Sequence, residues 1–506
     1  MVGLGLRSPE TPWPRIALLG RFDVARFGEL LLPRIHEAEL RRRLPGSRVL
    51  PYAPLGPEHP VALDGGLTAL PLGAWSPENA ARLAAAADAV IVAGADVLTT
   101  DDTALGADYG LSAGEAHRRH FSGFFLEGPR PKGPMAWSAA GVPFDFDEAD
   151  APRLRGALQD ARYVSVRDDV SRRRLVQAGT ERDITVVPDP VALAFRVFEP
   201  AVLARRLDYL RLMEWFPRGG APVVVQGSEA LVAHAESIAA ALTGAIAGRN
   251  APVLLLETEP AEGSRFAEAL MPRLRGAFRV PASVSLVDIL AVFSGARFFV
   301  GDSVHGHMAA LGFGVPSLFV SVGEVAPALA ALGDAAPASA HPADSGNALP
   351  RLLGQARTAG LPSPVAVRLE AHFDALAGFA DRAVAESFEG DTGPRSREGT
   401  GLLRALQDAE LRLDATREAW EARSEQIAAL RIELAEQLES LESGFASQAD
   451  RALLAERDAQ LAQRLGELEA MRAEFLRFTN LRLFRYTAPL RRLYASLRRA
   501  LSRTGG

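Results

Sequence analysis

Short apolar segments that alternate with helical stretches, in two successive sets, constrain the fold of this chain more than any other feature. In the first set, Arg15–Gly20 and Asp88–Gly94 are apolar runs that end in glycine, and 162–166 and 184–187 are further short apolar runs. Helical stretches lie at 28–44 and near 169–178. Such runs are typical of strands buried on both faces of a mainly parallel sheet. The pattern predicts a Rossmann-like α/β domain over residues 15–197.

A second set of the same kind follows. Strands are expected over 222–226, 251–256, 296–300 and 316–320, with helical segments between them. This set predicts a second Rossmann-like domain over residues 198–387. Two such domains in tandem are expected to face each other across a cleft. The carboxyl ends of the strands would line that cleft, where open α/β sheets usually bind ligands.

The remainder of the chain differs in composition. A turn-rich linker is expected over 388–402. Beyond it, apolar residues recur in steps of seven, first from Leu406 to Leu441 and then, after a phase break near Gly444, from Leu454 to Phe475. This repeat predicts a coiled coil over 403–475, through which the chain would form a homo-oligomer. One long solvated helix packed on the core is the alternative.

The last segment, 476–506, carries eight arginines and no acidic residue. Leucine, phenylalanine and tyrosine residues are interleaved with these arginines. Basic residues with apolar anchors are typical of peripheral contact with an anionic membrane surface. The segment therefore predicts a basic amphipathic tail. Docking of the tail on an acidic face of the same protein is the alternative.

Composition excludes several classes of function. The chain has no cysteine, which excludes disulfides, thiolate zinc sites and cysteine nucleophiles. Its nine histidines show no metal-ligand spacing, so no metal site is expected. The net charge of -6 gives no sign of nucleic-acid binding. Without a signal-peptide core or a membrane-spanning run, the expected location is the cytoplasm, with peripheral contact at the inner membrane face.

The segment Phe298–Val320 is the strongest candidate for a functional site. A strand is expected to end at Gly301, and Asp302 or Ser303 can cap the helix that follows. His305 then lies in the first turn, where free backbone amides form an anion site. The helix end lowers the pKa of His305 and a bound anion raises it, so titration near neutrality would suit a general acid. A capping or core histidine is the alternative, and the neighbouring His307 is expected to be structural or at the surface.

Ser303-Val-His-Gly306, followed by Ala-Leu-Gly-Phe-Gly-Val-Pro, closely resembles the S-x-H-G…A…G-x-P signature of the polysaccharide pyruvyl transferase family. Three other parts of the chain agree with the family in the expected order. They are 16–20 with Gly28-Glu-Leu, the glycine-containing segment 88–96, and 163–171 with Val187-Pro-Asp-Pro190. The resemblance covers roughly residues 15 to 330.

The resemblance implies a glycosyltransferase-B-like fold. It also implies transfer of a pyruvyl ketal from phosphoenolpyruvate to hydroxyls of a cell-surface glycan or its lipid-linked precursor, with no cofactor. His305 would be catalytic and would protonate the methylene carbon of the donor. The guanidinium of Arg167 suits a carboxylate or phosphate, although a salt bridge to Asp168 or Asp189 is the alternative. The other residues that the resemblance implies in substrate binding are Ser303, Gly306, Gly20 and Gly94.

Two other functions compete with this interpretation. A nucleotide-sugar-dependent glycosyltransferase could use the same architecture, with Glu257 after the strand at 251–256 as the carboxylate for the ribose. A non-catalytic scaffold in glycan assembly, held together by the coiled coil, is the third hypothesis. Departures from the family pattern, such as Glu29 after Gly28 and Ala-Gly-Ala at 93–95, favour that reading.

Overall fold

The computed structural model describes residues 13–24, 26–54, 69–72, 76–94, 97–98, 109, 111–112, 133–249, 251–257, 262–280, 285–390 and 432. Apart from residue 432, the coiled coil expected over 403–475 and the basic tail expected over 476–506 lie outside these residues, so both stay predictions. Within the described ranges, no helix is both long enough and apolar enough to cross a membrane.

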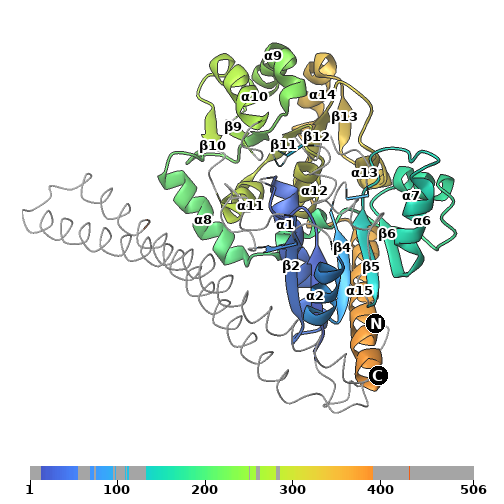
Figure 1. Ribbon diagram of the computed structural model, residues 1–506. Coiled ribbons are helices and arrows are strands. Elements are labelled where there is room, and N and C mark those ends of the chain that lie inside the picture. The colour runs from blue at the N-terminus through green and yellow to red at the C-terminus, as the bar shows by residue number, and fades with distance from the viewer. Residues whose placement is uncertain are drawn as a thin grey trace, which may run out of the picture. The chain divides into compact units, whose positions relative to one another are not determined.

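The first lobe contains, among the described residues, a seven-stranded sheet in which all neighbouring strands are parallel. In spatial order its strands are β3 (Leu70–Pro71), β2 (Arg48–Ala53), β1 (Arg15–Leu19), β4 (Ala89–Ala93), β5 (Met135–Ala140), β6 (Ala161–Val166) and β7 (Thr185–Val186). The helices packed on it are α1 (Phe27–Arg43), α2 (Pro77–Ala86), α6 (Ala151–Gln159), α7 (Asp169–Gln177) and α15 (Ser363–Gly390). Figure 1 shows α15 alongside the strands of this sheet.

The second lobe repeats the arrangement with a six-stranded parallel sheet, again counted over the described residues. Its strands are β10 (Phe278–Val280), β9 (Val253–Leu256), β8 (Val223–Val225), β11 (Phe298–Gly301), β12 (Ser317–Val320) and β13 (Ala338–Ala340). Its α-helices are α8 (Pro200–Leu212), α9 (Ala235–Ile246), α10 (Glu262–Leu270), α11 (Leu286–Gly295), α12 (Val304–Gly312), α13 (Pro327–Ala330) and α14 (Ser345–Leu352). Short 3-10 helices are η2 (Pro190–Arg196), η3 (Glu229–His234), η4 (Met271–Arg273), η5 (Gly333–Ala335) and η6 (Pro342–Asp344).

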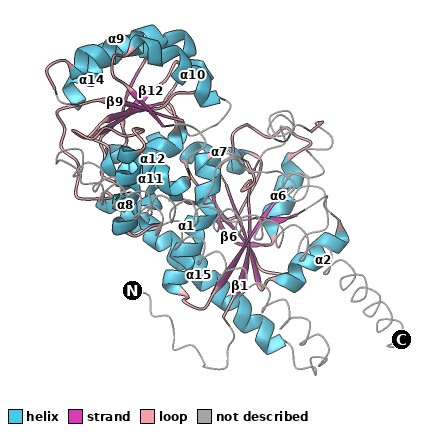
Figure 2. Ribbon diagram, turned by 90° about the vertical axis from the view of Figure 1, so that its left-hand side faces the viewer, coloured by secondary structure: helices cyan, strands magenta, loops and turns pink. Residues whose placement is uncertain are grey.

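Alternate side chains of the central strands enter different cores, as the two-residue period of a strand requires. Ile16 and Leu18 of β1 belong to the core that also contains side chains of α1 and α15, whereas Ala17 and Leu19 pack with α2, α6 and α7. The first of these cores continues through α11 and α12 of the second lobe. Figure 2 shows helices on both sides of each sheet. The two parallel α/β lobes fit the glycosyltransferase-B-like architecture that the family resemblance implies.

The last described helix crosses from one lobe to the other. α15 begins in the region 198–387, which the sequence pattern assigns to the second domain, but it contacts α1, β4, β5 and β6 of the first lobe. It also continues to Gly390, inside the linker expected over 388–402. The boundary drawn from the strand pattern therefore does not separate the packing units, because a helix carries no local signal for the sheet that it covers.

A buried chain of polar side chains holds α15 on the first sheet. The hydroxyl of Tyr163 lies 2.8 Å from Nδ1 of His372, whose Nε2 lies 3.0 Å from Oγ of Ser138. The Ser138 hydroxyl lies 2.8 Å from Nε2 of His36, and Nδ1 of His36 lies 2.8 Å from the carbonyl oxygen of Leu32. Because a carbonyl only accepts, His36 donates from Nδ1, and the direction of every other bond in the chain follows.

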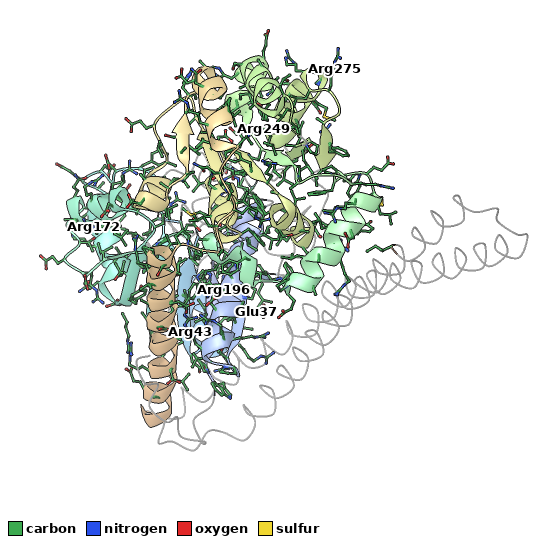
Figure 3. The ribbon with its side chains drawn as sticks, turned by 180° about the vertical axis from the view of Figure 1, so that it is seen from behind. Glu37, Arg43, Arg172, Arg196, Arg249 and Arg275 are labelled. Atoms are coloured by element: carbon green, nitrogen blue, oxygen red, sulfur yellow. The ribbon has the colours of Figure 1, made fainter. Side chains whose placement is uncertain are left out.

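Charged side chains add a second link between α1, η2 and α15. Arg43 of α1 and Arg196 of η2 both bind the carboxylate of Glu370 in α15, and both also bind Glu39 of α1. Figure 3 shows Arg43 and Arg196 close to α15. The α15 helix is thus fixed to the first lobe by apolar, polar and ionic contacts together.

Candidate active site

Each sheet has one place where the strand order reverses, between β1 and β4 in the first lobe and between β8 and β11 in the second. Gly20 follows β1, and a Cβ atom there would lie 2.5 Å from the carbonyl oxygen of Ala93 in β4. Gly301 ends β11, where a Cβ atom would lie 2.5 Å from the carbonyl oxygen of Gln226. Both glycines therefore allow neighbouring backbones to approach at the strand ends where open α/β sheets bind ligands.

Gly94 lies at the end of β4 with φ of +156°. A Cβ atom at this position would lie 2.4 Å from Cγ1 of Val97, so both backbone conformation and space require glycine here. Gly20 and Gly94 thus lie at the predicted strand ends. Their local contacts explain both glycines through the backbone, and binding of a substrate by them stays a prediction.

The start of α12 is built as the sequence pattern predicts. The hydroxyl of Ser303 accepts a hydrogen bond from the amide of Gly306 at 3.1 Å and so caps the helix. The amide of Ser303 in turn donates to Oε1 of Gln226 at 3.1 Å. At Gly306 a Cβ atom would lie 2.6 Å from the ring of Phe299. Its missing side chain admits the aromatic ring of β11, and binding of a substrate at Gly306 stays a prediction.

His305 extends from the second lobe to groups of the first. Its Nε2 lies 3.4 Å from Oδ2 of Asp189, and 18% of its side chain is exposed. Asp189 follows β7 and also accepts a hydrogen bond from the amide of Val191 at 2.9 Å. On the other side of the ring, a Cβ atom at Gly28 would lie 1.9 Å from Nδ1 of His305. The imidazole is therefore placed by α12, by the start of α1 and by the loop after β7.

The charges around His305 favour its protonated form. Burial acts to lower the pKa of His305, but the Asp189 carboxylate and the charge of Glu29 outweigh it, so the pKa is raised above its ordinary value. Burial acts to raise the pKa of Asp189, but His305, the Val191 amide and Arg167 together lower it. The two shifts have one physical cause, because an imidazolium and a carboxylate stabilise each other's charged form.

Arg167 lies close to this pair. It follows β6, and its positive charge acts to lower the pKa values of both His305 and Asp189. Its Nε lies 3.7 Å from Oδ2 of Asp168, so one of the salt bridges considered from the sequence is present. The side chain is 17% exposed. Arg167 and His305, which the sequence singles out from different lobes, thus interact electrostatically, and their roles with a substrate stay predictions.

His307 is a structural residue. Its Nδ1 lies 2.9 Å from the hydroxyl of Ser317 and its Nε2 lies 3.0 Å from the carbonyl oxygen of Gly301. Its ring packs between those of Phe299 and Phe319. Burial lowers the pKa of His307 to about 4, so the ring is neutral at physiological pH. It fastens β11 to β12 and offers no group for chemistry.

Several buried polar residues near the site were not identified from the sequence as its parts. Glu29 is 3% exposed in the first turn of α1, beside Gly28. Asp23, which follows β1, accepts a hydrogen bond from the hydroxyl of Tyr109 at 2.8 Å. The acidic residue next to Gly28 and the one shortly after β1 were the available signal in the sequence. Among the described residues, no group of three or more histidine, aspartate or glutamate side chains is arranged to hold a metal ion.

Glu257, the carboxylate proposed to bind the ribose of a nucleotide, already has an ionic partner. Glu257 is 3% exposed, and its carboxylate forms an ion pair with Arg279 of β10. A buried carboxylate that is already paired with a guanidinium is a poor acceptor for ribose hydroxyls. The structure therefore does not favour Glu257 for that role.

A model of the family described as polysaccharide pyruvyl transferase matches residues 20–324, more than half of the 506 residues. The chain belongs to the polysaccharide pyruvyl transferase family. The matched range contains His305, Asp189 and Arg167, so the whole ionic group lies within the pyruvyl transferase region. Membership points to a transferase of the pyruvyl transferase kind. No curated protein matches the chain.

Similar solved structures are remote from this pyruvyl transferase family member in sequence. The UDP-GlcNAc 2-epimerase from Methanocaldococcus jannaschii is 13% identical with a TM-score of 0.45, over 68% of this chain and 93% of that one. The UDP-GlcNAc 2-epimerase from Neisseria meningitidis is 12% identical with a TM-score of 0.43, over 72% and 98%. The wall teichoic acid polymerase TagF is 9% identical with a TM-score of 0.40, over 74% and 89%. Likenesses this remote carry no information on substrate.

Proposed function

We propose that the chain transfers a pyruvyl group from phosphoenolpyruvate to two hydroxyls of a cell-surface glycan, or of its lipid-linked precursor, and forms a ketal. The observation that carries the proposal is the position of His305, with Asp189 at its Nε2, Gly28 against its Nδ1 and the charge of Arg167 acting on the pair. Phosphoenolpyruvate is small and strongly anionic, and its enol carbon must be protonated before a hydroxyl can add. An imidazolium beside a guanidinium supplies both an acid and a positive charge.

In the first step, Arg167 would hold the carboxylate or phosphate of the donor. Asp189 would hold the Nε2 side of His305, so that the proton leaves from Nδ1, next to Gly28. This proton passes to the methylene carbon of phosphoenolpyruvate, which becomes a methyl group. Positive charge develops on the neighbouring carbon, and a first sugar hydroxyl attacks that carbon and loses its proton.

In the second step, the bond between this carbon and the phosphate oxygen breaks. A second hydroxyl then attacks the same carbon and also loses its proton. Of the two protons released, one restores His305 and the other leaves on the phosphate as hydrogenphosphate, so atoms and charge balance. No oxidant, metal or cofactor takes part in these steps.

The direct test incubates the purified full-length chain with phosphoenolpyruvate and a panel of pyruvate-free glycans. We expect phosphate release that depends on a glycan, together with a glycan product that carries one added pyruvyl ketal by mass spectrometry. Exchange of phosphoenolpyruvate for nucleotide sugars tests the glycosyltransferase alternative. Turnover with a nucleotide sugar, or with neither donor, would contradict the proposal.

Variants test the roles of the individual side chains. His305→Ala should abolish transfer, while Arg167→Ala should weaken phosphoenolpyruvate binding and the matched exposed variant Arg172→Ala should change neither.

Asp189→Asn keeps the acceptor for the Val191 amide but removes the charge that raises the pKa of His305. The alkaline fall of kcat/KM should therefore move to lower pH. An unchanged pH profile in Asp189→Asn would remove the carboxylate from the mechanism.

A further inference from the structure

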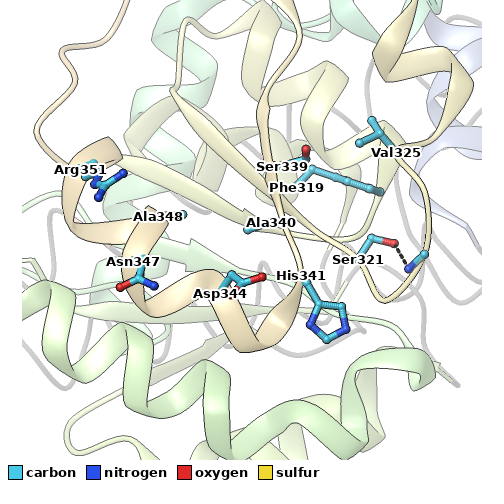
Figure 4. Close-up of a pocket in the computed structure, with 11 residues that line it drawn as sticks. Phe319, Ser321, Val325, Ser339, Ala340, His341, Asp344, Asn347, Ala348 and Arg351 are labelled. Carbon is cyan, nitrogen blue, oxygen red and sulfur yellow. Dashed lines mark hydrogen bonds between the residues drawn. The ribbon is translucent and has the colours of Figure 1, made fainter.

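A pocket in the second lobe lies outside the His305 site and has no role in the steps above. It has a volume of about 440 Å³, within the range of roughly 300–1,000 Å³ that is usual for small-molecule sites. One wall is formed by Asp344 of η6 and by Asn347, Ala348 and Arg351 of α14. These positions are three or four residues apart, so they share one face of the helical segment. Figure 4 shows these side chains around the pocket.

The opposite wall is formed by the ends of β12 and β13 and by the loop after β12. It contributes the hydroxyls of Ser321 and Ser339, the ring of Phe319 and the side chain of Val325. Val325 is 36% exposed, so this wall has an apolar surface open to solvent. The pocket thus combines hydroxyl, amide, carboxylate and guanidinium groups, and the imidazole of His341, with small apolar faces.

The pocket opens on the same edge of the second sheet as His305. β11 and β12 are parallel neighbours, with Gly301 opposite Phe319. Parallel neighbours lie about 4.8 Å apart. His305 stands in the helix that follows β11, whereas Phe319 of β12 lines the pocket. His307 bonds to both strands and packs on Phe319, which fixes the position of the pocket relative to the start of α12.

The charges of the pocket select against a second anionic donor. Its lining includes one carboxylate, of Asp344, one guanidinium, of Arg351, and the imidazole of His341, so the side chains do not form a cluster of permanent positive charges. A phosphate site would require an excess of cationic groups or a cluster of backbone amides. A neutral sugar instead offers vicinal hydroxyls for carboxylate, amide and guanidinium groups, and C–H faces for Val325 and Ala348.

We propose that this pocket binds one neutral sugar unit of the acceptor glycan, next to the unit that receives the pyruvyl group. The role given to the pocket rests on the proposed transfer reaction, because a sugar held at this edge would place the following sugar unit toward His305. Asp344 is suited to contact the sugar, since its side chain makes no capping hydrogen bond to α14. The pocket would therefore determine which glycan is modified, without acting on phosphoenolpyruvate.

Kinetics of two matched variants test the proposal. Asp344→Ala removes a pocket carboxylate, and Asp334→Ala removes an exposed aspartate from the 3-10 helix η5, away from the pocket lining. With a glycan that the wild type modifies, we expect the acceptor KM to rise about fivefold or more in Asp344→Ala, as for the loss of one hydrogen bond of about 1 kcal/mol. The KM for phosphoenolpyruvate and kcat should stay unchanged. Equal acceptor KM values in the two variants would overturn the proposal.

A binding measurement separates this inference from the proposed reaction. Saturation-transfer NMR with methyl glycosides of galactose, glucose, mannose and N-acetylglucosamine, without phosphoenolpyruvate, requires no turnover. Binding of one glycoside by the wild type and by Asp334→Ala, with loss in Asp344→Ala, supports the pocket even if pyruvyl transfer fails. Binding of none of them by the wild type, or equal binding by Asp344→Ala, refutes the pocket whatever the outcome of the transfer assay.

Discussion

The contact between Gly28 and His305 shows how much of the site depends on a missing side chain. Gly28 lies in the first turn of α1, where alanine would be the better helix former by about 1 kcal/mol. A methyl group there would overlap Nδ1 of His305, so only glycine leaves the imidazole in place. A residue that is unfavourable for its own helix therefore serves the helix of the opposite lobe.

This contact predicts a specific loss of function. Gly28→Ala should displace the His305 ring and lower kcat/KM about 100-fold or more, because a shift of about 1 Å at a reacting group has such an effect. Initial rates of phosphate release measure the change. The control is Gly244→Ala in α9, where a Cβ atom meets nothing within 4 Å. That variant should keep full activity and gain about 0.5–1 kcal/mol of stability. Full activity in Gly28→Ala would show that the ring does not depend on this contact.

At the scale of elements, α15 is held to the first sheet by two neutral buried histidines. Burial, opposed by the hydrogen bond to Leu32, lowers the pKa of His36 to about 4. Burial, together with the nearby His36 and Arg43, lowers the pKa of His372 to about 3. Both rings ionise near pH 6.5 in the unfolded chain. Between pH 6.5 and pH 4 the unfolded state therefore binds more protons, and folding stability falls as the pH falls.

We expect the free energy of unfolding to drop on acidification through this window by on the order of 1.4 kcal/mol per pH unit for each of these histidines. Urea unfolding at several pH values measures the slope. His372→Asn should reduce the slope by the contribution of one proton. If His372→Asn unfolds with the wild-type pH dependence, the buried chain is not the source of the acid sensitivity.

The strands that the sequence predicts are those with continuous apolar runs. β1, β4, β11 and β12 have such runs, and each is found within a residue or two of its expected range. β2 and β5 were not predicted. Pro51 interrupts the apolar run of β2, and a proline argues against a strand. β5 consists largely of small residues around Ser138, and so lacks the branched side chains typical of strands.

Only part of the candidate site could be predicted from the sequence, because some of its features are local and others depend on contacts between the lobes. The Ser303 cap and the position of His305 in the first helical turn are local features, so the sequence around them is sufficient. The pairing of His305 with Asp189 depends on how the end of β7 meets α12, and no local pattern encodes that approach. The same holds for Gly28, whose role appears only when the two lobes are packed together.

At the scale of the whole molecule, one apolar core runs from α1 and α15 of the first lobe to α11 and α12 of the second. The predicted coiled coil over 403–475 is expected to serve assembly of the chain.

Light scattering can test this expectation. The full-length chain should be an oligomer, whereas a chain that ends at Gly390, the last residue of α15, should be a monomer with an unchanged melting temperature. The melting temperature shows whether the truncated chain still folds. The same molar mass per chain in solution for both forms would assign oligomerisation to the lobes instead.

The position of His305 between the two lobes affects when it can donate a proton. His305 belongs to α12 of the second lobe, while Asp189 and Gly28, on either side of its ring, belong to the first lobe. Any movement that separates the lobes would remove the imidazole from the charges that raise its pKa. If His305 is the acid, donor molecules that arrive while the halves are apart meet a weaker proton source. Wasteful loss of phosphate to water would then be suppressed until both halves have closed on their substrates.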